Sequence, residues 1–215
     1  WVSDDDAYLK DDALKQASDY LEEQPDLDKI SAICGKVIKN GKMDINHGKY
    51  YYKKGIRICE ASIPAEMYEK KEFEMGSFTY VGTIMNKKKL LEAGLPNKDY
   101  FIYWDDLEHG IRMRKAGKII GVPGIVAYHD VGEEGSGINW KLYYSYRNMI
   151  DTYRKHFSGV CYDYFCLKIR VKIFLNHMTG HKKLELNILE EAFKNARQQK
   201  FGLHPVYRPG WKPGE

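Results

Sequence analysis

The pattern of hydrophobic residues changes character once along this chain, at the glycine-rich segment DVGEEGSG (130–137). Before this segment, apolar runs typical of buried strands alternate with amphipathic stretches typical of helices, which predicts an α/β fold. After it, three long stretches have helical spacing: residues 139–157, 160–179 and 182–200. We therefore expect an α/β domain over 1–138 and a helical annex over 139–215.

Turn residues and glycines divide the first domain into elements. The expected strands are 30–38, 49–59, 77–85 and 118–129. The expected helices are 11–23, 87–94 and 105–116, the first capped by Asp11 or Asp12 and the last ended by Gly117. Pro123 and Gly124 interrupt the last strand, so we expect this strand at a sheet edge or bulged.

Composition excludes several classes of protein. With 43% hydrophobic and 30% charged residues, the chain should be globular rather than disordered. No apolar run reaches the roughly 18 to 20 residues that cross a bilayer. Four cysteines lie far apart without metal-ligand spacing, so we expect reduced thiols and a cytoplasmic protein.

Charge is distributed unevenly along the chain, although the net charge is only +4. Residues 1–28 contain ten acidic residues, whereas residues 141–183 contain nine Lys or Arg against Asp151 and Asp163. A basic region of this kind predicts an anionic partner, which could be a diphosphate, a lipid headgroup or a polyanion. Because residues 160–179 also interleave aromatic and aliphatic side chains with bases, a peripheral position on the inner face of a membrane is one expectation.

Acidic residues gather at two places, and a histidine follows the last expected strand. Asp4 and Asp6 lie two residues apart in a triplet with Asp5, a spacing that lets both carboxylates reach one Mg²⁺ or Mn²⁺ ion. The alternative for the triplet is a solvated turn that caps the next helix. His129 is either a third metal ligand or an ordinary hydrogen-bonded histidine.

The second acidic cluster follows an aromatic run, in the sequence FIYWDDLE (101–108). Asp105 and Asp106 fall where a helix begins, and free amides there favour an ionised carboxylate. Such a carboxylate could act as a general base, and ordinary N-capping is the alternative.

In combination, these segments resemble the family 2 glycosyltransferases with the GT-A fold, a Rossmann-like α/β domain. The resemblance runs in the family's order through WVSDDDAYL, FTYVGTIMNKKKLLEAGLP, FIYWDDLEHGIRMRKAGKIIGVPGIVAYH and WKLYYSYRNMIDTYRKHF, most of residues 1–157. It looks closest to the galactofuranosyl- and rhamnosyltransferase-like members. The resemblance implies an inverting hexosyltransferase of cell-wall or polysaccharide biosynthesis.

The resemblance also implies roles for individual residues. Asp4 and Asp6 match the DxD motif, which holds the metal that bridges the donor diphosphate, and His129 matches a late metal ligand. Asp106 matches the catalytic base. Trp104 is expected to pack against a sugar ring, and Arg147 is expected to be either a structural clamp or a diphosphate contact. The positions matching the donor and acceptor pocket are Asp5, Gly82, Thr83, Trp104, Asp105, Glu108 and Arg147.

The DxD motif lies near the middle of the catalytic domain in this family, whereas here it begins at residue 4. The family therefore implies a nucleotide-binding half upstream of this segment, without which we expect no activity. The implied partners are a nucleotide sugar, with a UDP- or dTDP-sugar as the first candidates, and a glycan or lipid-linked acceptor. Residues 130–138 are expected to form a loop that closes over the donor.

Two other classes of function stay open. A divalent-metal phosphoryl-transfer enzyme would also use clustered carboxylates, although such sites usually need more of them to hold two ions. A non-enzymatic module that binds a polyanion or membrane through residues 141–183 is the second alternative. Nucleic acid is not an expected partner, because the front of the chain is acidic and no known binding motif occurs.

Overall fold

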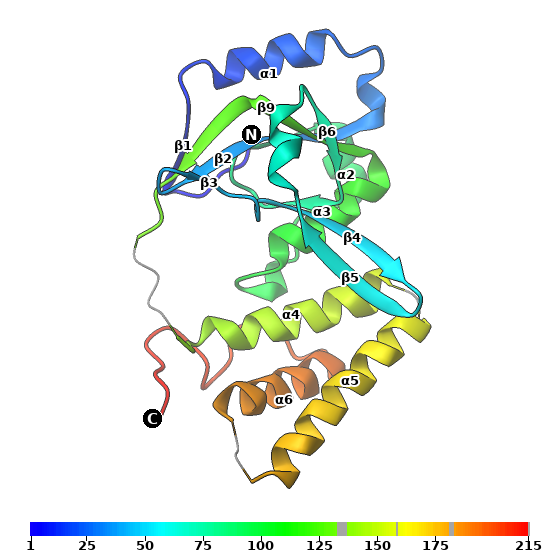
Figure 1. Ribbon diagram of the computed structural model, residues 1–215, viewed down its shortest axis with the longest axis vertical. Helices are drawn as coiled ribbons and strands as arrows, with labels where there is room; N and C mark the ends of the chain where they lie inside the picture. The colour runs from blue at the N-terminus through cyan, green and yellow to red at the C-terminus, as the bar shows by residue number, and fades with distance from the viewer. Residues whose placement is uncertain (133–136, 158, 181–182, 215) are drawn as a thin grey trace. The chain divides into compact units, whose positions relative to one another are not determined.

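The computed structural model describes residues 1–132, 137–157, 159–180 and 183–214 (Figure 1). The chain packs into two compact units. The first comprises residues 1–51, 60–96 and 106–134, and the second comprises 52–59, 97–105 and 135–215. Strands and helices of both units confirm the expected α/β class. Residues 52–59 and 97–105, which precede the boundary expected at residue 138, belong to the second unit.

A six-stranded mixed sheet organises the first unit (Figure 1). Its central strands are β9 (Lys118–His129) and β2 (Ile30–Lys39), which run parallel. β1 (Ala7–Leu9) and β6 (Phe73–Met75) pair antiparallel with β9, while β3 (Lys42–Met43) and β8 (Thr83–Met85) pair antiparallel with β2. A second sheet has the order β5–β4–β7, formed by Arg57–Ser62, Gly48–Lys54 and Ser77–Phe78.

Successive residues of the central strands point to opposite sides of the larger sheet, and both sides are apolar. Helices therefore cover both of its faces. Ile33 and Ile120 pack on one face with α1 (Ala13–Glu22). Ala32 and Ile119 pack on the other face, in the cluster that includes Met113 of α3 (Asp105–Ala116). α2 (Lys87–Ala93) follows β8 and is capped by the Asn86 side chain. α1 begins after Asp12, whose side chain makes no capping hydrogen bond, contrary to the expectation from sequence.

β9 occupies the interior of the sheet and carries a bulge, so the second of the two expected alternatives, an edge strand or a bulged strand, is confirmed. Pairing with β2 skips from Gly121 to Val126 while β2 advances only from Cys34 to Lys36. Pro123 lies in the skipped stretch, where its missing N–H costs no ladder bond. The bulge brings Ile125 so close to Gly35 that a Cβ on Gly35 would lie 2.7 Å from the Ile125 carbonyl oxygen.

Two other strand predictions were too simple. The expected strand 49–59 is a hairpin of β4 and β5, because Gly55 adopts a φ of 60° at its tip. The expected strand 77–85 is broken into β7 and β8 by a turn at residues 79–82. The Thr83 hydroxyl donates to the Thr79 carbonyl at 2.8 Å across this turn, and Gly82 has a φ of 69°. Glycine tolerates that conformation without steric cost.

The second unit is mainly helical. α4 (Lys141–His156), α5 (Gly159–Met178) and α6 (Leu184–Arg197) share an apolar core that includes Ile150, Ile169 and Leu189. No helix within the described residues is long and apolar enough to cross a membrane. All four cysteines are free, as expected. Residues 133–136 of the loop expected to close over the donor lie outside the described residues, so that expectation stays a prediction.

Candidate functional site

Sheet pairing brings the acidic triplet to the end of β9. β1 begins directly after the triplet and pairs with β9 so that Ala7 lies opposite His129. The Asp130 amide donates to the Asp6 carbonyl at 3.1 Å, which continues this pairing into the triplet. The Ala7 amide donates to the Asp4 carbonyl at 3.3 Å and closes the triplet into a turn. Residues more than 120 positions apart therefore meet through backbone register.

The side chains at this place form a compact group of possible metal ligands. His129 Nε2 lies 3.1 Å from Asp6 Oδ1 and 3.8 Å from Asp4 Oδ2. One ligand atom from each of the three residues lies within 4.8 Å of the others. Partial burial raises the pKa of the Asp4 carboxyl, His129 opposes the rise, and Asp6 and Asp5 add to it. Asp5 is exposed on the turn and is not part of this group.

The segment containing Gly82 and Thr83 lies beside the residues that precede the acidic triplet. The Val2 amide donates to the Thr83 carbonyl at 3.0 Å, two residues before Asp4. Thr83 itself is fully buried, and its hydroxyl is bonded to the Thr79 carbonyl. The structure thus brings the backbone of this segment near the group of possible metal ligands, while the Thr83 side chain supports the turn.

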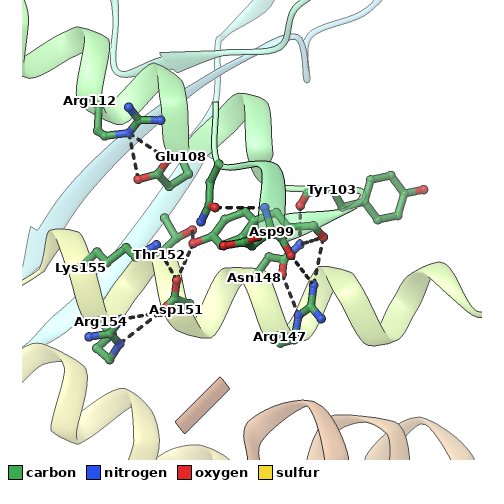
Figure 2. Close-up of polar contacts among 12 residues, drawn as sticks. Asp99, Tyr103, Glu108, Arg112, Arg147, Asn148, Asp151, Thr152, Arg154 and Lys155 are labelled. Atoms are coloured by element: carbon green, nitrogen blue, oxygen red, sulfur yellow. Dashed lines mark hydrogen bonds and ion pairs between the residues drawn. The ribbon is translucent and has the colours of Figure 1, made fainter. Parts of the chain in front are cut away.

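The acidic motif lies at the N-terminus of α3. Asp106 is half-buried, and its Oδ1 accepts a hydrogen bond from the Leu107 amide at 2.6 Å. Glu108 is 3% exposed and forms an ion pair with Arg112 at 3.0 Å (Figure 2). Arg112 in turn donates to the carbonyls of residues 93–95, at the C-terminal end of α2. Glu108 therefore anchors α3 within the first unit, a structural task beside the acceptor contact expected from sequence.

Trp104, Asp105 and Arg147 belong to the second unit. Trp104 is only 8% exposed, and its ring meets the Tyr153 ring edge-on at 5.8 Å. Arg147 is fully buried on α4 and donates to the carbonyls of Asp99, Tyr100 and Gly202. These contacts match the structural clamp considered for Arg147, and its role in a transferase stays a proposal.

Two features escaped the sequence reasoning. His47 is 1% exposed, its Nδ1 lies 2.5 Å from the Thr79 hydroxyl, and burial lowers its pKa to about 4. Asn148, next to Arg147 on α4, is fully buried and donates to three backbone carbonyls. No charge or periodicity in the sequence marks either residue, because their partners are distant backbone and hydroxyl groups.

Comparison with known proteins gives limited further support. No protein-family model matches this chain. Galactofuranosyltransferase GlfT2 of Mycolicibacterium smegmatis is 26% identical over 117 residues, which cover 46% of this chain and 18% of that protein. The chain thus aligns with less than a fifth of its relative. This similarity points to a glycosyltransferase family and supports a glycosyltransferase-like function for the chain.

Proposed function

We propose that this chain forms the metal- and acceptor-binding part of an inverting glycosyltransferase. The enzyme would move a sugar from a nucleotide-sugar donor, such as a UDP- or dTDP-sugar, to a glycan or lipid-linked acceptor. The observation that carries the proposal is the meeting of Asp4, Asp6 and His129 at the end of β9. The similarity to a galactofuranosyltransferase supports the same class of reaction.

The donor atoms of this group fit a divalent cation. Two carboxylates and one imidazole would hold Mn²⁺ or Mg²⁺ and leave other coordination positions for phosphate oxygens. When bound, the ion would neutralise charge that develops on the departing nucleoside diphosphate. Asp4 and Asp6 are half-exposed, with side-chain accessibilities of 49% and 44%, so a donor can approach them from solvent.

Asp106 is proposed as the general base. Its carboxylate would take the proton of the acceptor hydroxyl while that oxygen attacks the anomeric carbon and the bond to the diphosphate oxygen breaks. The Leu107 hydrogen bond and the helix N-terminus both favour the ionised carboxylate that this role needs. General base catalysis of this kind contributes about 10² to 10⁴-fold to rate.

The phosphoryl-transfer alternative has less support. Two-metal sites of that class usually place ions about 4 Å apart and need several bridging carboxylates. Within the described ranges, one group of three His, Cys, Asp or Glu residues could hold a metal ion, and it has two carboxylates. A single-ion site of this composition fits a nucleotide-sugar donor better.

A peripheral membrane position for a lipid-linked acceptor is a further part of the proposal. α5 exposes Leu167, Phe174 and Met178, with exposed fractions of 55%, 61% and 69%, and also carries exposed Lys168 and Arg170. Apolar and basic side chains on one helix suit an anionic lipid surface. Sedimentation with vesicles of neutral and 30%-anionic lipid, compared between the natural protein and Phe174→Ser, tests this directly. Equal binding to both vesicles, or none to either, would contradict it.

The activity test uses the longest natural chain that contains this segment. Nucleoside-diphosphate release is measured from a panel of nucleotide sugars with Mn²⁺ or Mg²⁺ and a lipid-extract acceptor. We expect release from one donor, dependent on the metal and reduced about 10² to 10⁴-fold in kcat by Asp106→Asn. Asp163→Asn, an exposed acid on α5, is the matched control and should keep full activity. Absence of release from every donor by a folded protein would overturn the proposal.

A further inference from the structure

The backbone immediately before the acidic motif is strained. Phe101 has φ 67° and ψ −53°, the conformation of a classic γ-turn, and the Ile102 amide donates to the Tyr100 carbonyl at 2.8 Å to close it. Tyr103 and Trp104 also have positive φ angles of 62° and 69°. None of the three is glycine, so each conformation is unfavourable unless surrounding contacts enforce it. Such strain commonly occurs at functional sites.

Asn148 on α4 binds this strained backbone directly (Figure 2). Its Nδ2 lies 3.0 Å from the carbonyl oxygens of Tyr100 and Ile102, and 2.8 Å from that of Tyr103. One side-chain amide thus shares its two N–H bonds among three carbonyls of a four-residue stretch. The carbonyls on both sides of the γ-turn are thereby held at a fixed separation.

Arg147 fixes the orientation of Asn148 and adds further hydrogen bonds to the same backbone segment. Its Nε donates to Asn148 Oδ1 at 3.0 Å, which leaves the amide nitrogen of Asn148 directed at the carbonyls. Its other nitrogens donate to the carbonyls of Gly202 at 2.7 Å, Tyr100 at 3.0 Å and Asp99 at 3.4 Å. Burial lowers the pKa of Arg147, and no carboxylate in the described parts of the chain forms an ion pair with it.

The side chain of Tyr100 is held from the same helix. Its hydroxyl donates to Asp151 Oδ2 at 2.8 Å and lies 3.2 Å from the Thr152 hydroxyl. Asp151 is fully buried and is also bonded to Arg154 and Lys155. Both the backbone and the side chain of the segment before α3 are therefore attached to α4 (Figure 2).

We propose that Asn148 and Arg147 are positioning residues that act on Asp106. They hold residues 100–104 in the strained conformation from which α3 begins, and so set the backbone at the start of the helix that carries Asp106. The catalytic part of this inference rests on the base role proposed above for Asp106. Arg147 has every guanidinium nitrogen engaged and no exposed surface, so a diphosphate contact is not its task.

The test replaces Asn148 by leucine in the longest natural chain. Asn148→Leu keeps approximate size and removes the donors. Its control is Asn176→Leu, because Asn176 is a buried amide on α5 that bonds Asn187 and Lys183, away from this segment. We expect kcat to fall about 100-fold in Asn148→Leu, as small displacements of catalytic groups do, while the donor KM and the Mn²⁺ affinity change less than about threefold. Asn176→Leu should keep kcat.

Two further readouts separate positioning from general destabilisation. The protein is labelled with 5-fluorotryptophan, and the Trp104 resonance is assigned with Trp104→Phe. Asn148→Leu should shift or broaden that resonance, and Asn176→Leu should not. In an Asp106→Asn background, Asn148→Leu should lower kcat less than about threefold, because its effect passes through the missing base. Arg147→Lys keeps the charge but not the planar guanidinium. It should change the Trp104 resonance and kcat in the same way, and it replaces Asn148→Leu in the test if that variant does not fold.

The outcomes distinguish the two proposals. An unchanged Trp104 resonance, or a full 100-fold loss retained in the Asp106→Asn background, would overturn the positioning role. Full activity of Asp106→Asn would instead overturn the base role. In that event the Trp104 resonance alone still shows whether Asn148 holds the segment.

Discussion

The triplet turn at Asp4–Asp6 and the segment 100–104 before α3 are constructed in opposite ways. At the triplet, backbone pairing of β1 with β9 brings the possible metal ligands together, and Asp4 and Asp6 are left half-exposed. At the segment, the backbone is strained, and fully buried polar side chains of α4 hold it. The fold does not depend on the exposed carboxylates of the first place, whereas the second place depends on polar groups that are also part of the core.

This difference has an energetic consequence. Exposed carboxylates contribute little to stability, because water solvates them well in both the folded and unfolded chain. Buried donors are different, since their removal leaves carbonyl acceptors unpaired in a medium that cannot solvate them. Changes at the triplet should therefore separate activity from stability, and changes at α4 should couple the two.

The largest expected effect is on activity at the triplet. Asp4→Ala combined with Asp6→Ala removes both carboxylates of the ligand group, and loss of metal-dependent charge stabilisation should lower activity by about 10³-fold. The urea midpoint of unfolding without metal should stay unchanged, because both side chains are half-exposed. Steady-state release of nucleoside diphosphate and urea titration measure the two quantities. A clear fall in the midpoint would show that the triplet also supports the fold.

The next largest effect is on stability at α4. Arg147→Met removes the guanidinium from four hydrogen-bond acceptors and should destabilise the protein by about 2 to 4 kcal/mol, the sum expected for several buried unpaired groups. Lys168→Met, on the exposed surface of α5, is the control and should change stability little. Urea unfolding followed by circular dichroism provides the measurement. Equal midpoints for the two variants would mean that the buried contacts of Arg147 contribute nothing net.

The same contrast explains which elements of the fold could be predicted from the sequence. β2 and α3 were predicted nearly to the residue, because a mainly apolar run marks the first and the glycine at 117 marks the end of the second. The sequence left β9 open between an edge strand and a bulged strand, because its interior position depends on how its bulge meets Gly35, and that requires knowledge of both strands. The hairpin at Gly55 was missed because residues that favour strands lie on both sides of the turn, tyrosines before it and Ile56 and Ile58 after it.

The ligand group and the strained segment differ in the same respect. The grouping of Asp4, Asp6 and His129 was expected from the resemblance to a family whose motifs combine these positions, and the pairing of β1 with β9 brings the three side chains together. The three positive φ angles at 101–104 could not be anticipated, since aromatic residues carry no preference for that conformation. Asn148 was equally hidden, because a single amide that binds backbone carbonyls leaves no pattern in the sequence.

A smaller effect concerns acid stability of the first unit. Burial lowers the pKa of His47 and of His109 to about 4, below the ordinary value of 6.5. The unfolded chain therefore binds more protons below pH 6.5, so stability falls as the pH drops from about 6.5 to about 4, by up to about 3 kcal/mol for each histidine. His47→Gln should flatten that slope in urea titrations at several pH values. An unchanged slope would mean that His47 is protonated in the folded protein.

The smallest effect is expected at Gly82, the last residue of the turn before β8. An alanine there must keep a φ of 69°, and its Cβ would lie 3.0 Å from the Ala127 Cβ. The left-handed backbone alone costs a non-glycine residue about 1 kcal/mol, and Gly82→Ala should lower stability by about that amount. Gly41→Ala is the matched control, because it has a φ of 77° with no atom near the added Cβ. Since both variants share the backbone cost, a larger loss for Gly82→Ala measures the contact with β9. Equal losses of stability for the two variants would show that the residues around Gly82 can shift to accept a methyl group. That result is expected if strand register, rather than tight packing, determines this end of the sheet.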